Sequence, residues 1–207
     1  MGRNVPDRAA EIGRRVVHHA VEEVRIVGGD LRGRALATPR SDLIRPTTDR
    51  TREAVFNVLQ HRYPGALEGR RVLDLFAGTG ALGLEALSRG ASFTVFIEEG
   101  AEGRGLIRQN VEAFGLSGRT KIFRRDATAL GPVGTMQPFG LLFADPPYNR
   151  ELGQAALQSA LSGGWLQEDA LCVVEESAAA VFDPPQGFVT EDARSYGETV
   201  IRFLRRA

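Results

Sequence analysis

The hydrophobic positions after residue 70 form short apolar runs that alternate with longer amphipathic stretches. The runs predict strands, and the stretches predict helices because they have a helical period and several of them end at a glycine. The expected strands are 71–76, 93–98, 121–124, 139–144 and 171–175, and the expected helices are 82–89, 102–114 and 151–161. Alternation of such apolar strands with helices is typical of a parallel sheet that is buried on both faces.

The two ends of the chain depart from this alternation. Residues 187–190 and 198–204 form consecutive strand patterns with no helix between them, which predicts an antiparallel pair at an edge of the sheet. Near the N-terminus, residues 24–27 and 34–38 flank glycine-containing turns, and this pattern predicts a small hairpin outside the main core.

A helix is expected to begin at Pro46 and to end at Pro64 and Gly65. Its expected apolar stripe consists of Ala54, Val55, Val58 and Leu59. Its charged residues Arg50, Arg52 and Glu53 are expected to lie away from that stripe.

Length and composition indicate one substantial core, since the chain has 207 residues of which 43% are hydrophobic. We expect a flexible extension over residues 1–23, a hairpin and helix over 24–62, and a main domain over 63–207. No apolar run reaches about 18 residues and the first twenty residues are charged, so we expect a cytoplasmic protein without a membrane span or secretory signal. The single cysteine, Cys172, excludes an internal disulfide and a multi-cysteine metal site, and we expect no metal.

The formal net charge of zero hides an asymmetry along the chain. Residues 1–71 hold 14 arginines, no lysine and 9 acidic residues, which gives +5, and the remaining residues therefore carry −5. Guanidinium groups offer forked donors and a flat face, which suit phosphates and bases. The basic N-terminal segment is therefore a candidate nucleic-acid interface, although a solvated basic surface would have the same composition.

The segment from Val72 to Gly80 combines a strand with a glycine-rich turn that leads into a helix. In an open parallel sheet, ligands bind at the carboxyl edge where such turns lie. Gly78 and Gly80 allow a ligand to approach the backbone closely, because a side chain would occupy its space. With Gly83 the pattern also matches a dinucleotide fingerprint, so the glycines by themselves do not identify the ligand.

Acidic residues recur at the ends of successive predicted strands and favour S-adenosylmethionine over NAD. Asp74 suits the ammonium group of a methionine moiety and would lie badly beside a pyrophosphate. Glu98 suits ribose hydroxyls in either cofactor. Asp126, followed by Ala127, could accept a hydrogen bond from an adenine amino group. Each acid alone could be a surface carboxylate or a helix cap, and it is their recurrence that predicts a pocket.

The predicted strand 139–144 leads into Asp145, Pro146, Pro147 and Tyr148. Two prolines stiffen this loop and remove two donors, so its carboxylate and carbonyls only accept hydrogen bonds. Acceptors on the N–H groups of an exocyclic base amine help its nitrogen to attack a sulfonium methyl in line. Tyr148 offers a face on which an extruded base can stack. The loop predicts methylation of an amino nitrogen on a flat target.

These residues resemble the class I methyltransferases with a D-P-P-Y motif, and more narrowly the bacterial family that methylates N2 of a guanine in 16S ribosomal RNA. The narrower resemblance covers about residues 24–204 and depends on segments 25–29 and 33–34, on Arg45 to Arg50, on Arg52 to Ala54, and on Phe56 and Asn57. The block around Arg45-Pro46-Thr47 is its most specific part.

The resemblance implies a seven-stranded, mostly parallel Rossmann-like sheet with helices on both faces and a small N-terminal hairpin and helix that bind RNA. It implies an enzyme that acts on 16S rRNA within the 30S subunit or its assembly intermediates. Separately, we expect a monomer in the cytoplasm. The expected cofactor residues are Asp74, Ala77, Gly78, Gly80, Glu98, Asp126 and Ala127, and the expected catalytic residues are Asp145, Pro146, Pro147 and Tyr148. The expected RNA-binding residues are Arg25, Arg32, Arg34, Arg45, Arg50 and Arg52.

Three alternatives stay open from the residues themselves. An adenine-N6 DNA methyltransferase would use the same acceptor loop, although the chain has little room for a separate target-recognition domain. An NAD-dependent oxidoreductase is disfavoured because no hydride-transfer partner is evident and the Asp145 loop would have no role. A binding module that retains a nucleotide pocket without catalysis is disfavoured by the intact motifs.

Overall fold

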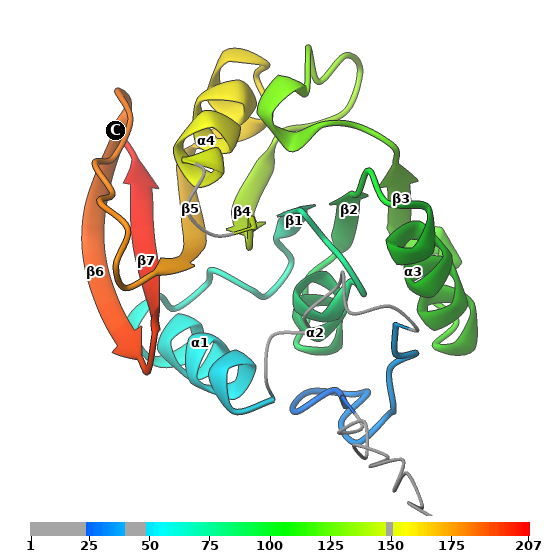
Figure 1. Cartoon of the computed structure of the whole chain (residues 1–207). Coiled ribbons are helices and arrows are strands. Elements are labelled where there is room, and N and C mark those ends of the chain that lie inside the picture. Colours follow the sequence, from blue (N-terminus) through cyan, green and yellow to red (C-terminus); the bar gives the residue numbers. More distant parts are fainter. Residues whose placement is uncertain (1–23, 40–48, 148–150) are drawn as a thin grey trace, which may run out of the picture.

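The computed structural model describes residues 24–39, 49–147 and 151–207 and contains a seven-stranded sheet (Figure 1). The strands are β1 (Arg71–Leu75), β2 (Phe93–Ile97), β3 (Thr120–Phe123), β4 (Phe139–Ala144), β5 (Leu166–Ser177), β6 (Phe188–Tyr196) and β7 (Thr199–Arg206). Their order across the sheet is β3-β2-β1-β4-β5-β7-β6, and β7 runs antiparallel to both of its neighbours. The expected Rossmann-like architecture, with an antiparallel pair at one edge, is confirmed.

Helices cover both faces of this sheet (Figure 1). They are α1 (Asp49–Arg62), α2 (Ala81–Ser88), α3 (Ala101–Ala113) and α4 (Leu152–Ser162), with short 3₁₀ turns at Ser117–Arg119 and Ala127–Ala129. Buried side chains of α1, α2 and α3 pack in one apolar cluster on one face, and those of α4 pack in a second cluster on the other face. Within the described ranges, no helix is both long and apolar enough to span a bilayer.

The strand predictions are correct where apolar runs are long, because those strands are buried on both faces. All six residues of β4 are buried, and so are four of the five in β1 and in β2. Two strands are much longer than expected, and β7 runs two residues past its expected end, to Arg206. β5 begins at Leu166, across an irregularity in its pairing with β4, and β6 continues to Tyr196 through polar residues. An edge strand such as β6 is solvated on its outer side and therefore lacks the apolar signature used to predict it.

The N-terminal hairpin is present, but its expected position outside the core is wrong. Ile26 N donates to Arg34 O at 2.9 Å and Leu36 N donates to Val24 O at 2.8 Å, which pairs the two segments. The side chains of Ile26 and Leu36 are only 1% and 4% exposed and belong to the same apolar cluster as α1 and α2. Alternation along the hairpin directs these apolar side chains into the core.

Helix α1 is present, and three of the four residues of its expected apolar stripe are buried: Val55, Val58 and Leu59. Ala54 is only half-buried, and Phe56, which was not placed in the stripe, is 0% exposed. Pro46 lies outside the described residues.

The expectation that Arg52 lies on a solvent-facing side, available to RNA, is wrong, because its side chain is 0% exposed. Helical spacing does place position 52 on the buried face, three and seven residues before Val55 and Leu59, but the charge of its side chain led to the opposite expectation.

The carboxylate of Glu85, on α2, is the centre of a buried polar cluster that includes Arg52. Its Oε1 accepts from Arg89 Nε at 2.7 Å, and its Oε2 lies 3.6 Å from Arg52 Nε and accepts from Val27 N at 2.8 Å. Arg52 also donates to the backbone oxygen of Arg25. The cluster thus joins α1, α2 and the hairpin through charged groups that are shielded from water.

Replacing Glu85 with alanine is predicted to lower the free energy of unfolding by about 3–5 kcal/mol, because Arg89 loses its buried carboxylate and Arg52, of the two described, keeps only that of Asp49, at 2.6 Å. Urea unfolding monitored by circular dichroism measures this loss. Glu112→Ala, at an exposed position of α3, is the control and should change stability by no more than about 0.5 kcal/mol. Equal stability of the two variants would contradict the assigned role of the cluster.

Candidate active site

The loop between β1 and α2 has an unusual backbone. Phe76, Gly78 and Gly80 have φ angles of 56°, 53° and 78°. Glycine adopts this left-handed region freely, whereas a residue with a Cβ is strained there, and such strain is found mainly at ligand-binding sites. The loop is tied to the next strand because Ala77 N donates to Ile97 O at 3.1 Å. The predicted glycine turn is therefore a fixed structure at the carboxyl edge of the sheet.

Glu98, the first residue after β2, holds this turn from the side. Its Oε2 accepts from Gly78 N at 2.8 Å, and its Oε1 accepts from Gly100 N at 2.6 Å. A carboxylate has about four acceptor positions, so both oxygens retain capacity for a ligand. A Cβ at Gly103 would lie 2.8 Å from Gly78 O, so only glycine permits this approach of α3 to the turn.

Asp74 lies beneath the turn and is 2% exposed. Its Oδ2 accepts from Gly83 N at 2.9 Å and so satisfies a donor in the first turn of α2. A Cβ at Gly83 would meet the Phe96 ring at 2.4 Å, which explains the glycine. Burial holds the pKa of Asp74 well above its usual value, and repulsion from Asp145 and Glu98 raises it further.

The register of the sheet brings these carboxyl groups to one edge. Leu75 is aligned with Ile97 of β2 and with Ala144 of β4, so Glu98 and Asp145 follow their strands at the same level. With the buried carboxyl group of β1, they form an acidic edge. An anionic pyrophosphate would be repelled there, whereas a ligand that carries positive charge would be attracted. These three carboxyl groups therefore fit a cationic cofactor better than a dinucleotide.

Asp126 lies at the same edge, three residues after β3, whose last residue Phe123 is aligned with Ile97. It is exposed, and its Oδ1 accepts from Thr128 N at 2.8 Å and from the Thr128 hydroxyl at 2.7 Å. Ala127 is 3% exposed and packs in the apolar cluster beneath α4. The capping bond fixes the orientation of the Asp126 carboxylate at the rim of the acidic edge.

The loop after β4 completes the site as far as the structure describes it. Asp145 is half-buried, Pro146 is buried and Pro147 is exposed. Tyr148 lies outside the described residues. Asp145 directly follows Ala144, which is aligned with Leu75 just before the glycine turn, so the loop and the turn are close in space.

Four of the arginines expected to contact RNA are exposed: Arg25, Arg32, Arg34 and Arg50. The guanidinium of Arg34 donates to Ala113 O at 2.6 Å and lies 4.9 Å from the centre of the Phe114 ring, which binds the hairpin to the end of α3. Arg45 lies outside the described residues. Arg52 belongs to the buried cluster and is removed from the set.

One residue that supports the site was missed by the sequence analysis. Asn110, in α3, is 2% exposed. Its Nδ2 donates to Thr79 O in the glycine turn at 3.1 Å, and its Oδ1 accepts from Ala37 N at 2.8 Å. The side chain therefore connects the turn to the second segment of the hairpin. An asparagine within a helix carries no local signal of such a role, because both partners are distant in sequence.

Comparison with known proteins connects this geometry to a family. Residues 24–205 match the family model described as "Conserved hypothetical protein 95". The chain is 39% identical over 160 residues to "Ribosomal RNA small subunit methyltransferase D" of Escherichia coli (strain K12), covering 76% of this chain and 77% of that protein. It is 29% identical over 186 residues to "Putative rRNA methyltransferase YlbH" of Bacillus subtilis (strain 168), covering 88% and 99% of the two chains.

Among solved structures, "Putative methyltransferase yhhF from Escherichia coli" matches with a TM-score of 0.76 and 32% identity, covering 89% of this chain and 98% of that chain. The chain has the same fold as this methyltransferase over nearly its full described length. It belongs to the family of ribosomal RNA small subunit methyltransferase D, whose model carries the description "Conserved hypothetical protein 95".

Proposed function

We propose that the chain transfers a methyl group from S-adenosylmethionine to the exocyclic N2 of a guanine in 16S rRNA. The observation that carries this proposal is the convergence of an acidic, glycine-lined edge with the Asp145 loop in a chain of this family. The proposed partners are the 30S subunit or its assembly intermediates, which implies action in the cytoplasm. A monomer suffices, because one chain supplies every residue proposed for the site.

The proposed cofactor site uses the glycine turn and the acidic edge. Gly78, with Ala77, would leave room for the cofactor against the backbone, and Gly80 would contribute through the left-handed conformation that shapes the turn, since a Cβ there would meet Ile107 and Phe96. Glu98 would accept the ribose hydroxyls, and Asp126 with Ala127 would lie at the adenine. Asp74 would attract the ammonium group of the methionine moiety. When bound, the cofactor supplies an electrophilic methyl group on a positively charged sulfur, and the acidic edge favours that charge.

The proposed catalytic loop acts on the nucleotide. Asp145 accepts an N–H of the target amine, and the loop carbonyls offer further acceptors, because Pro146 and Pro147 contribute no donor. Tyr148 stacks on the extruded base. Hydrogen bonds from the N–H groups of the amine to these fixed acceptors orient the amine and help to localise the lone pair on its nitrogen, which then attacks the methyl group. The loop needs neither a metal nor a covalent intermediate.

The choice of guanine comes from the family and not from the loop. The N6 amine of adenine would meet the same acceptors, so the loop alone allows both bases. RNA is favoured over DNA by the relatives and by the exposed arginines of the hairpin, Arg25, Arg32 and Arg34, which together with Arg50 are proposed to contact phosphates. These contacts would position the particle without selecting the base.

Asp74→Asn separates the structural role of this side chain from its proposed cofactor role. The amide oxygen still accepts from Gly83 N, so the fold should persist. Because the folded pKa of Asp74 is raised, the stability tied to its proton is lost as the pH rises from about 4 through that folded pKa. Asparagine does not ionise and escapes this loss. At a pH above the folded pKa of Asp74, the free energy of unfolding of the variant should therefore be at least about 1 kcal/mol higher than that of the wild type.

The proposed cofactor role of Asp74 is measured by calorimetric titration of the Asp74→Asn variant with S-adenosylhomocysteine. Loss of a charge-assisted contact should weaken binding at least about tenfold. Asp183→Asn, at an exposed position, is the matched control and should change neither quantity. Unchanged affinity in the Asp74 variant would remove this residue from the cofactor site.

Asp145→Ala tests the proposed reaction. Transfer of labelled methyl from the cofactor to unmodified 30S particles should fall about 10²- to 10³-fold in kcat, because an acceptor fixed for the transition state is lost. Affinity for S-adenosylhomocysteine should stay nearly unchanged, since Asp145 is proposed to bond the target amine and makes no proposed hydrogen bond to the cofactor. Asp145→Asn retains one acceptor oxygen and should retain intermediate activity. Full turnover by the alanine variant would refute the catalytic assignment.

A further inference from the structure

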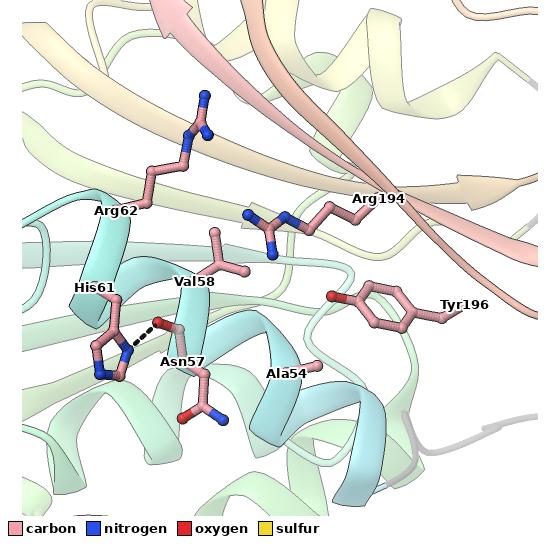
Figure 2. A pocket seen from close by; sticks show the side chains of 7 residues that line it. All are labelled: Ala54, Asn57, Val58, His61, Arg62, Arg194 and Tyr196. Atoms are coloured by element: carbon pink, nitrogen blue, oxygen red, sulfur yellow. Dashed lines mark hydrogen bonds between the residues drawn. The ribbon is translucent and has the colours of Figure 1, made fainter.

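A groove of about 570 Å³ separates α1 from the end of β6 (Figure 2). It is lined by Ala54, Asn57, Val58, His61 and Arg62 of α1 and by Arg194 and Tyr196 of β6. None of these residues belongs to the site proposed for the cofactor or for the methylated base. The groove is therefore a surface feature with no role in the function proposed so far.

Two arginines reach into this groove from opposite sides (Figure 2). Asp192 lies between them, with Oδ2 at 3.6 Å from Arg62 Nε and at 3.0 Å from Arg194 Nε. The side chains of Arg62 and Arg194 remain 52% and 42% exposed. Each guanidinium has five N–H donors, so one shared carboxylate orients the pair and leaves donors for an anion. The three groups together keep a net charge of +1.

The remaining lining is aromatic and apolar. Tyr196 directs its ring and hydroxyl toward the groove from the β6 side, opposite Ala54 and Val58 (Figure 2). His61 lies further along α1 and is held by a 2.8 Å contact between its Nδ1 and Asn57 O. Arginines beside an aromatic face and a small apolar surface are typical of sites that bind single-stranded nucleic acid by phosphate contacts and base stacking.

The groove lies at the same edge of the sheet as the proposed catalytic loop. Ala144 is aligned with Val174, Val174 with Arg202, and Arg202 with Ala193. Arg194 therefore stands at the level of Asp145, three strands away, which is about 14 Å. Helix α1, which forms one wall of the groove, also contacts the strand that leads into the proposed catalytic loop, because Phe56 packs on Phe143 of β4 with 5.5 Å between ring centres.

We propose that this groove binds single-stranded RNA adjacent to the methylated nucleotide, with Arg62 and Arg194 on backbone phosphates and Tyr196 stacked on a base. The inference rests on the RNA substrate of the proposed function. A protein partner fits less well, because the apolar part of the lining is limited to Ala54, Val58 and the tyrosine ring. The groove would fix the strand that flanks the target while the hairpin arginines contact another part of the particle.

Two substitutions with matched controls test the proposal. Tyr196→Leu should weaken binding of a short fluorescent single-stranded RNA about 5- to 150-fold, and Tyr196→Phe, which keeps the ring, should stay within about twofold of the wild type. Arg194→Ala should reduce the slope of log affinity against log salt by about 0.7. Arg108→Ala, an exposed arginine of α3 at the far end of the sheet, should leave that slope unchanged.

The same variants separate this proposal from the proposed function. Both groove variants should raise KM for 30S particles while leaving kcat and affinity for S-adenosylhomocysteine unchanged. RNA affinity and salt slope equal to those of the wild type would overturn the groove assignment, even if the wild type methylates rRNA. Normal oligonucleotide binding with a raised KM for particles would also overturn it and assign the groove to a protein of the particle. RNA binding through the groove by a wild type that methylates no rRNA would refute the proposed function and leave the groove assignment standing.

Discussion

The glycine turn between β1 and α2, held by two carboxyl groups, is the constraint on which the rest of the site depends. Asp74 fixes Gly83 from below and Glu98 fixes Gly78 from the side. Both bonds are possible because parallel strands end together, so side chains from β1 and β2 meet at one edge. The β4 loop with Asp145 ends at the same edge. Three acidic groups are thereby brought close together, and their mutual repulsion is relieved by a cationic ligand.

The buried cluster around Glu85 extends this constraint to the N-terminal part of the chain. Helix α2 begins at the glycine turn and carries Glu85, whose carboxylate contacts Arg52 of α1 and the backbone of Val27 in the hairpin. Asn110 adds a second connection, since it bonds both the turn and Ala37. The surfaces proposed to bind RNA are therefore rigidly related to the acidic edge, which a reaction between a bound cofactor and one nucleotide of a large particle requires.

Elements whose residues follow a regular hydrophobic pattern could be predicted from the sequence, whereas contacts between distant segments could not. Apolar runs identify β1, β2 and β4 because both faces of these strands are buried. The edge strand β6 was predicted too short because most of its residues are polar and exposed. The acids at strand ends were predicted because parallel topology determines where they meet. Helical spacing places Arg52 on the buried stripe of α1, but the carboxylate that compensates its charge there was not predictable, since its partner Glu85 lies on another helix. The groove between α1 and Tyr196 was also not predictable, because its two walls are far apart in the sequence.

Methyl transfer to N2 of a guanine in 16S rRNA is tested by identifying the nucleoside that becomes methylated. Unmodified 30S particles, free rRNA and duplex DNA are each incubated with the enzyme and labelled cofactor, then digested to nucleosides and separated. N2-methylguanosine is expected from the ribosomal substrates. Methylated adenine as the sole product, from any of the three, would contradict the assignment of guanine, and the absence of a labelled nucleoside from every substrate would contradict the proposed methyl transfer itself.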